Sequence, residues 1–242
     1  MVLSKKDSKT RTPLARLIMK IKKQKTSSTI RTLNKDEVRE LLARNGNEAK
    51  DILCQIMEFG PIELLEYILG LPTRHPPIYP QAKTFRRQLI LRTNLEGNTF
   101  MASAFKGTLS SSRSHDKSDK HDKRDERDER DERDERDKSL VQMVKVIFIA
   151  ARMAIEENQT TRTSPRSVSP QIIDDPRSIL RQELPIYEAG WNYDKPDWYT
   201  PWNCAGSHGL FLTKAYLMGL EGKLEAEAAL TTAGRVAQGP PA

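Results

Sequence analysis

The amino-acid sequence predicts a mainly α-helical protein: a degenerate helical-repeat core of helix-turn-helix units, a disordered basic N-terminus and a charged low-complexity insertion. Three observations lead to this fold class. A glycine turn followed by Ile or Leu, then Glu and a short helix with apolar residues at helical spacing, occurs at 60–69 and again at 222–230. Such self-similarity indicates units that bury their apolar faces by stacking. One segment, 140–157, is apolar almost all round, as a buried helix is. Only 37% of the residues are hydrophobic and 30% are charged, so long stretches cannot bury enough apolar surface to offset their ordering entropy.

We divide the chain of 242 residues into seven segments on these patterns. In order they are a basic disordered or amphipathic arm at 1–31, helical units at 32–110, the charged insertion at 111–139, the buried helix at 140–157, a Ser/Pro linker at 158–183, an aromatic loop with a C-terminal helix pair at 184–236, and a tail at 237–242.

The basic arm contains ten Lys or Arg residues and one acidic residue. Proline at position 13 suits the first turn of a helix, and apolar residues at helical spacing follow it between 14 and 21. A basic amphipathic helix over residues 5–25 would bind an anionic membrane or the phosphates of a nucleic acid. The candidate contacts are Lys20, Lys22, Lys23 and Lys25. The same cluster is also typical of a nuclear import signal or of a solvated tail.

The helical units begin with a partial helix at 36–46 and continue with a helix over 48–59, whose apolar residues Ile52, Leu53, Ile56 and Met57 share one stripe. Gly60 then predicts a turn into the next helix. Another unit opens at 97, where Asn98 or Thr99 would cap a helix that ends at Gly107. The run 85–92 is a strand or a helix, and its Arg86 would add to a positive face.

A proline-rich connection carries Pro76, Pro77, Ile78 and Tyr79, a PPxY tetrapeptide. It resembles the WW-domain ligands of viral matrix and Gag proteins, in which prolines preform polyproline II and the tyrosine supplies an aromatic anchor. The resemblance implies a WW-domain partner. The structural alternative is a connection that proline stiffens after a helix.

The charged tract at 115–138 contains Arg-Asp-Glu four times in succession, from 124 to 135. Pairs of Glu and Arg at i,i+4 favour a solvated helix. Because the tract offers no apolar side chain for burial, we expect it to lie outside the core as a surface insertion.

The linker that follows the buried helix contains two Ser-Pro dipeptides, at 164 and 169. All three tryptophans come next, Trp191, Trp198 and Trp202, interleaved with proline and aspartate. This composition predicts a rigid aromatic loop rather than a strand. The loop is either a partner-binding patch, since Trp dominates binding hot spots, or a cover pinned over the core. Gly222 predicts the turn of the last helix pair.

Four pieces, at 36–47, 48–70, 97–107 and 213–236, resemble ankyrin repeats. Gly97-Asn98-Thr99 matches the opening of that repeat, 60–69 and 222–230 match its second helix, and Ala233-Gly234 matches its exit. The chain departs from the family in having no Thr-Pro-Leu-His tetrad. The resemblance implies stacked helix pairs that bind other macromolecules.

The residue types needed for chemistry are sparse. The chain has no phosphate-binding glycine loop and no nucleophile elbow. Cys204 and His208 lie four residues apart, but further metal ligands would have to come from distant positions. We therefore expect no catalytic residue, no cofactor and no metal.

With two cysteines, no long apolar run and no secretory signal, we expect an intracellular protein, cytoplasmic or nuclear. The predicted function is non-enzymatic protein–protein interaction through degenerate ankyrin-like repeats. The alternative is a viral-type matrix or accessory protein that binds membrane or nucleic acid and recruits WW domains.

Overall fold

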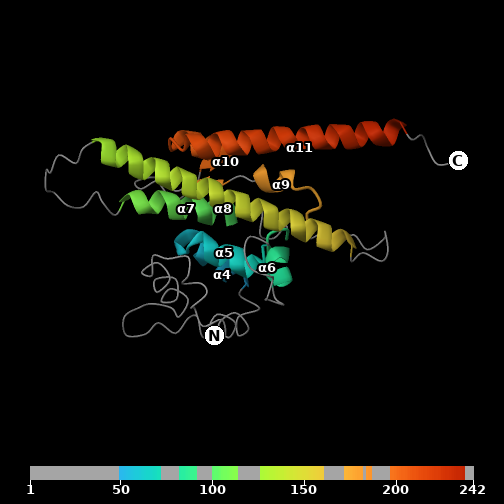
Figure 1. Ribbon diagram of the computed structural model, residues 1–242, viewed down its shortest axis with the longest axis horizontal. Coiled ribbons are helices and arrows are strands. Elements are labelled where there is room, and N and C mark those ends of the chain that lie inside the picture. The colour runs from blue at the N-terminus through green and yellow to red at the C-terminus, as the bar shows by residue number, and fades with distance from the viewer. Residues whose placement is uncertain are drawn as a thin grey trace.

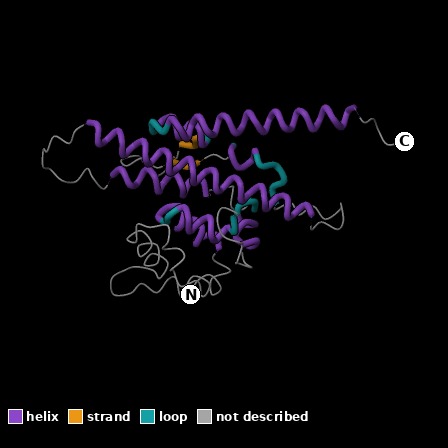
Figure 2. Tube along the Cα trace, in the orientation of Figure 1, coloured by secondary structure: helices purple, strands orange, loops and turns teal. Residues whose placement is uncertain are grey.

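The computed structural model describes residues 49–71, 82–91, 100–113, 126–160, 172–181, 184–186 and 197–237. The predicted basic arm and the partial unit at 36–47 lie outside these ranges. Helices make up nearly all of the described chain, with one short pair of strands (Figure 2). The mainly α-helical fold class is therefore confirmed. None of the described helices combines the length and the apolar character needed to span a bilayer.

The first predicted helix pair is present. Helix α4 (Ala49–Phe59) and helix α5 (Ile62–Leu69) flank Gly60, whose N–H donates to the carbonyl of Ile56 at 2.7 Å. A Cβ at Gly60 would lie 2.6 Å from that carbonyl oxygen, so the tight turn requires glycine. The predicted stripe of α4 is buried: Ile52, Leu53, Ile56 and Met57 are all at most 3% exposed. Helix α5 ends at Gly70, which has a φ of 61° and caps the helix in the left-handed conformation.

The run 85–92, predicted as a strand or a helix, begins within helix α6 (Ala82–Gln88). After this helix, Leu91 forms an isolated antiparallel β-bridge with Ile172. The prediction that Arg86 adds to a positive face is wrong, because this residue is only 7% exposed. Its Nη1 donates to the carbonyl of Leu69, the last residue of α5, at 2.6 Å, and Nη2 pairs with Glu157. A buried guanidinium needs such partners, and the end of α5 has carbonyls without helical donors.

Helix α7 (Phe100–Arg113) runs past Gly107, so the predicted helix end at this glycine is wrong. Gly107 has a different role, because a Cβ there would lie 2.3 Å from the carbonyl oxygen of Glu58 in α4. The glycine allows two helix backbones to approach each other closely.

Helix α8 (Glu126–Thr160) is a single helix of 35 residues. It joins part of the charged tract to the predicted buried helix, so the boundary at 139 is wrong, and residues 126–139 are not a separate insertion. Elongation adds one hydrogen bond for each residue that it orders, and the tract contains no glycine or proline to stop it. The apolar half is confirmed as the central helix: α8 contacts α5, α6, α7 and α11, and it crosses the middle of the molecule (Figure 1).

Part of the predicted Ser/Pro linker at 158–183 packs in the hydrophobic core. Ile172, Ile173, Ile179 and Leu180 are each at most 6% exposed, and the N–H of Ile173 donates to the carbonyl of Ile90 at 2.9 Å. The short helix α9 (Arg177–Leu180) follows. Four isoleucine and leucine side chains in nine residues outweigh the polar composition around them.

The aromatic region contains strands, contrary to the predicted loop. Strand β1 (Leu184–Ile186) pairs antiparallel with strand β2 (Asp197–Tyr199), and Trp198 lies opposite Pro185. Helix α10 (Pro201–Ser207) begins directly afterwards with proline at its first position.

Helix α11 (Phe211–Ala237) is continuous through Gly222, so the predicted C-terminal helix pair is wrong. A Cβ at Gly222 would meet nothing within 4 Å. A glycine in a helix interior costs only about 1 kcal/mol relative to alanine, which the buried inner face of α11 offsets. In Figure 1, α11 runs along one side of α8, and α4, α5 and α6 lie on the other side.

Candidate functional site

Most of the predicted site residues lie outside the described residues: Lys20, Lys22, Lys23, Lys25, Pro76, Pro77, Tyr79 and Trp191. The structure places two others. Trp198 is part of β2, and Trp202 in α10 is partly buried and packs against the core. This position fits the alternative of a cover over the core, and the partner-binding role of Trp202 stays a prediction.

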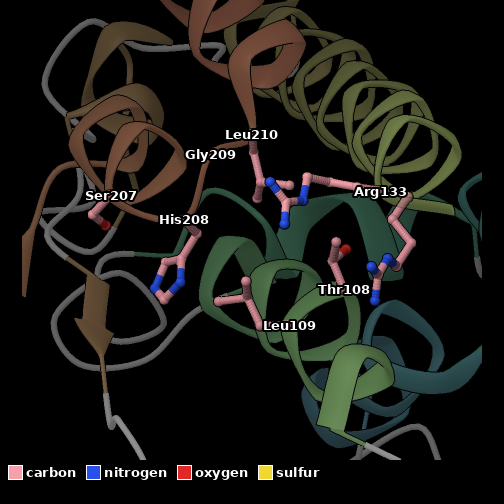
Figure 3. Close-up of a pocket in the computed structure, with 8 residues that line it drawn as sticks. Thr108, Leu109, Arg133, Ser207, His208, Gly209 and Leu210 are labelled. Atoms are coloured by element: carbon pink, nitrogen blue, oxygen red, sulfur yellow. The ribbon is translucent and has the colours of Figure 1, made fainter. Parts of the chain in front are cut away.

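A pocket of about 450 Å³ lies where α7, α8 and the connection between α10 and α11 meet. Thr108 and Leu109 come from α7, Arg133 and Arg136 from α8, and residues 207–210 from the connection. In Figure 3, Leu109 stands between Thr108 and His208. We call this the α7–α8–α10 pocket.

The arginines reach the pocket because of the spacing of the triplet repeat. Three residues turn an α-helix by about 300°, so successive arginines step around α8 by only about 60°. Arg133 and Arg136 therefore lie on the side of the helix that carries the buried Leu140. Asp134 and Glu135 lie on other sides and are exposed.

Asp137 follows these arginines and is 4% exposed. Its carboxylate accepts the N–H of Leu212 at 2.8 Å and the N–H of Thr213 at 2.9 Å. The hydroxyl of Thr213 donates to the same carboxylate at 2.6 Å. These N–H groups belong to the first turn of α11 and have no acceptor within that helix, so Asp137 caps α11 from another helix. The charged tract is thus joined to the core, which the sequence analysis excluded.

Burial disfavours the thiolate form of both cysteines. Burial raises the pKa of the Cys204 thiol to about 12, and burial also raises the pKa of Cys54 above its usual value. A thiol needs to lose its proton to bind a metal. Among the described residues, no three His, Cys, Asp or Glu side chains gather as metal ligands would.

The outer face of α11 is the second candidate site. Its inner face carries Thr213, Leu217 and Leu224, each at most 5% exposed. On the opposite side, large apolar residues are exposed: Phe211 at 70%, Leu230 at 74%, Met218 at 54% and Leu212 at 46%. In Figure 1 this helix forms the edge of the molecule.

Small residues connect these exposed apolar side chains. Ala215, Gly219, Gly222, Ala226 and Ala229 are all exposed and follow one another at separations of four, three, four and three residues. That spacing keeps them on one side of a helix. By helical geometry, no charged residue falls inside the stripe from Phe211 to Leu230. We call this surface the outer stripe of α11.

Sequence reasoning missed both surfaces. The signal for the outer stripe was present as the regular spacing of alanine and glycine, but Gly222 was interpreted as a turn. The signal for the pocket was the three-residue spacing of the arginines. This spacing shows that Arg133 and Arg136 share one side of a helix only once the tract is known to be helical.

Comparison with known proteins finds no match for this chain: no protein-family model, no curated protein and no solved structure.

Proposed function

We propose that this protein is a non-enzymatic protein–protein interaction protein, and that it associates with a second copy of itself through the outer stripe of α11. The observation that carries the proposal is the exposure of four large apolar side chains on one face of a helix of 27 residues. Apolar patches of this extent on a protein surface are typical of interaction sites.

The composition of the stripe favours another helix as the partner. Apolar residues at alternating separations of three and four are the seam of paired helices. Alanine and glycine at these positions allow the two backbones to approach closely, as Gly107 does between α7 and α4. Nothing within 4 Å occupies the space in front of Gly219 or Gly222.

The distribution of sizes along the stripe favours a second copy. Large side chains stand at both ends, Phe211 and Leu212 at one and Leu230 at the other, with Met218 and two glycines between them. In a two-fold antiparallel pair, the Phe211 end of one copy meets the Leu230 end of the other, and the glycines cross at the centre. The flanks carry both Lys223 and Glu225, so like charge does not oppose this pairing. Two-fold dimers are also the commonest protein assemblies.

The test is the molar mass of the full-length protein in solution, measured by light scattering and sedimentation over a concentration series. We expect a dimer for the natural sequence and a monomer for Ala226→Glu, because that change places a charge inside the seam. Gln142→Glu adds the same charge at an exposed position of α8 and should leave the dimer intact. A natural sequence that stays monomeric throughout would contradict the proposal, as would equal effects of the two variants.

The second candidate function rests on the sequence of two segments outside the described residues. The PPxY tetrapeptide ending at Tyr79 would recruit a WW-domain protein, and the lysines of residues 5–25 would bind an anionic membrane or nucleic acid. Together they describe the viral-type matrix or accessory protein. Binding of an isolated WW domain that Tyr79→Ala abolishes would support this function, and equal binding by both proteins would contradict it.

A further inference from the structure

We propose that the α7–α8–α10 pocket binds a small organic phosphomonoester, whose phosphoryl group is held by Arg133 and Arg136. This site is separate from the outer stripe of α11 and does not depend on self-association.

The first support is the positive charge of the pocket. Among the described residues, no carboxylate forms an ion pair with Arg133 or Arg136. Arg136 uses only its Nε, which donates to the carbonyl of Glu132 at 3.2 Å.

The nearest buried carboxylate does not compete for these guanidinium groups. Both oxygens of Asp137 accept hydrogen bonds from the first turn of α11. Asp134 and Glu135 lie on other sides of α8 by helical geometry and are exposed.

The positions of the donors favour a phosphoryl group over a carboxylate. Arg133 and Arg136 lie one turn apart, about 4.5 Å along the helix axis. Arg133 reaches across to the next segment, since its Nη1 lies 3.9 Å from the position of a Cβ at Gly209. A guanidinium binds a pair of oxygens with two parallel N–H groups. A phosphoryl group has enough oxygens for two such contacts, whereas a carboxylate has one pair.

The other walls favour an organic group attached to the phosphate. The pocket of about 450 Å³ is in the size range of small-molecule sites. Leu109 and Leu210 supply apolar surface. The hydroxyls of Thr108 and Ser207 donate to carbonyls of their own helices, at 3.1 Å and 2.9 Å. The Nε2 of His208 is buried without a hydrogen-bond partner among the described residues. The guanidinium groups and this ring nitrogen are therefore the polar groups that remain for a ligand.

The experiment is calorimetric titration of the full-length protein with phenyl phosphate, inorganic phosphate and benzoate. We expect phenyl phosphate to bind more tightly than inorganic phosphate, because the leucines cover the ring. Benzoate has the same ring but loses at least one charge-assisted pair of hydrogen bonds. We therefore expect its affinity to be lower than that of phenyl phosphate by about tenfold or more.

The variants Arg133→Gln and Arg136→Gln should each weaken phenyl phosphate binding about tenfold, and circular dichroism should show an unchanged fold because both changes leave the core intact. The matched control is Arg152→Gln, an arginine of the same helix that is outside the pocket and whose side chain is 44% exposed. Arg133→Lys should restore only part of the affinity, because an ammonium lacks the planar pair of donors.

Three results would overturn the proposal: no saturable binding of phenyl phosphate, equal affinity for benzoate, or an equal loss of affinity in Arg152→Gln. The last result would show that overall charge and not the pocket attracts the anion. Equal affinity for inorganic and phenyl phosphate would overturn the assignment of an organic phosphomonoester.

Discussion

Single charged residues hold the helices of this protein together at points where a helix ends. Arg86 donates to the carbonyl of Leu69 at the end of α5, and Asp137 accepts the N–H groups of Leu212 and Thr213 at the start of α11. Each therefore provides a hydrogen-bond partner for backbone groups that have none within their own helix. Arg181 joins helices in a different way, through side chains at the surface, where it pairs with Glu221 and Glu225 of α11 at 2.8 Å. Solvent weakens that contact, because surface ion pairs contribute at most about 1 kcal/mol.

The residue-scale prediction concerns Asp137. Asp137→Ala should lower the free energy of unfolding by about 2 to 3 kcal/mol, since it leaves buried N–H groups at the start of α11 without an acceptor. Urea unfolding, followed by circular dichroism, measures the change. Asp134→Ala alters the same tract at an exposed position and should change stability by less than about 0.5 kcal/mol. Similar values for the two variants would show that Asp137 does not cap α11.

At the scale of the elements, glycine has three different roles in helices that look alike in sequence. Gly60 makes a turn between α4 and α5, Gly107 allows α7 to approach α4, and Gly222 lies in an open helix face. The resemblance to ankyrin repeats stays a prediction for the pair α4 and α5. It does not extend to a helix pair at 213–236, because α11 is continuous there.

The two helical glycines predict stability changes of opposite sign. Gly107→Ala should destabilise the protein by about 1 to 3 kcal/mol, because the new methyl group meets the backbone of Glu58 and forces α7 and α4 apart. Gly222→Ala should stabilise it by about 0.5 to 1 kcal/mol, because alanine is the better helix former and the space is open.

Thermal unfolding in the Ala226→Glu background, which removes the proposed self-association, measures both glycine changes. Changes of the same sign would contradict the different roles assigned to these residues.

At the scale of the whole molecule, α8 is the element around which the others are arranged. The helix contacts α5, α6, α7 and α11, and its charged half lines the α7–α8–α10 pocket and caps α11. The two proposed surfaces are therefore coupled to the core through one helix, although one is a pocket and the other an exposed face.

The basic arm leads to a prediction for the full-length protein. Binding to anionic vesicles or nucleic acid should fall steeply with salt, because association releases counterions. Replacing Lys20, Lys22, Lys23 and Lys25 by Gln should weaken both interactions. Leu17→Ser with Ile21→Ser should weaken vesicle binding alone, since only a membrane buries the apolar stripe.

Co-sedimentation with vesicles and a filter-binding assay with nucleic acid separate these outcomes. Binding that does not change with salt, or no binding to either polyanion, would leave the arm with a role in solubility.

The sequence by itself determined that the fold is mainly α-helical, and it determined the buried face of α4 and the buried half of α8. The stripe Ile52, Leu53, Ile56 and Met57, the turn at Gly60 and the apolar half of α8 were all predictable, because they depend on periodicity over neighbouring residues. Local spacing encodes such features directly, and tertiary contacts then reinforce them.

Only the tertiary structure decided the roles of Gly107, Gly222, Arg86 and Asp137. A glycine ends a helix, admits a neighbour or does neither according to which backbone lies in front of it, and that backbone comes from a distant part of the chain. A charged residue can be buried only where the fold supplies a partner for it. Glu157 forms an ion pair with Arg86, and the first turn of α11 donates hydrogen bonds to Asp137. These partners are 71 and 76 residues away in sequence, beyond the range of any local pattern.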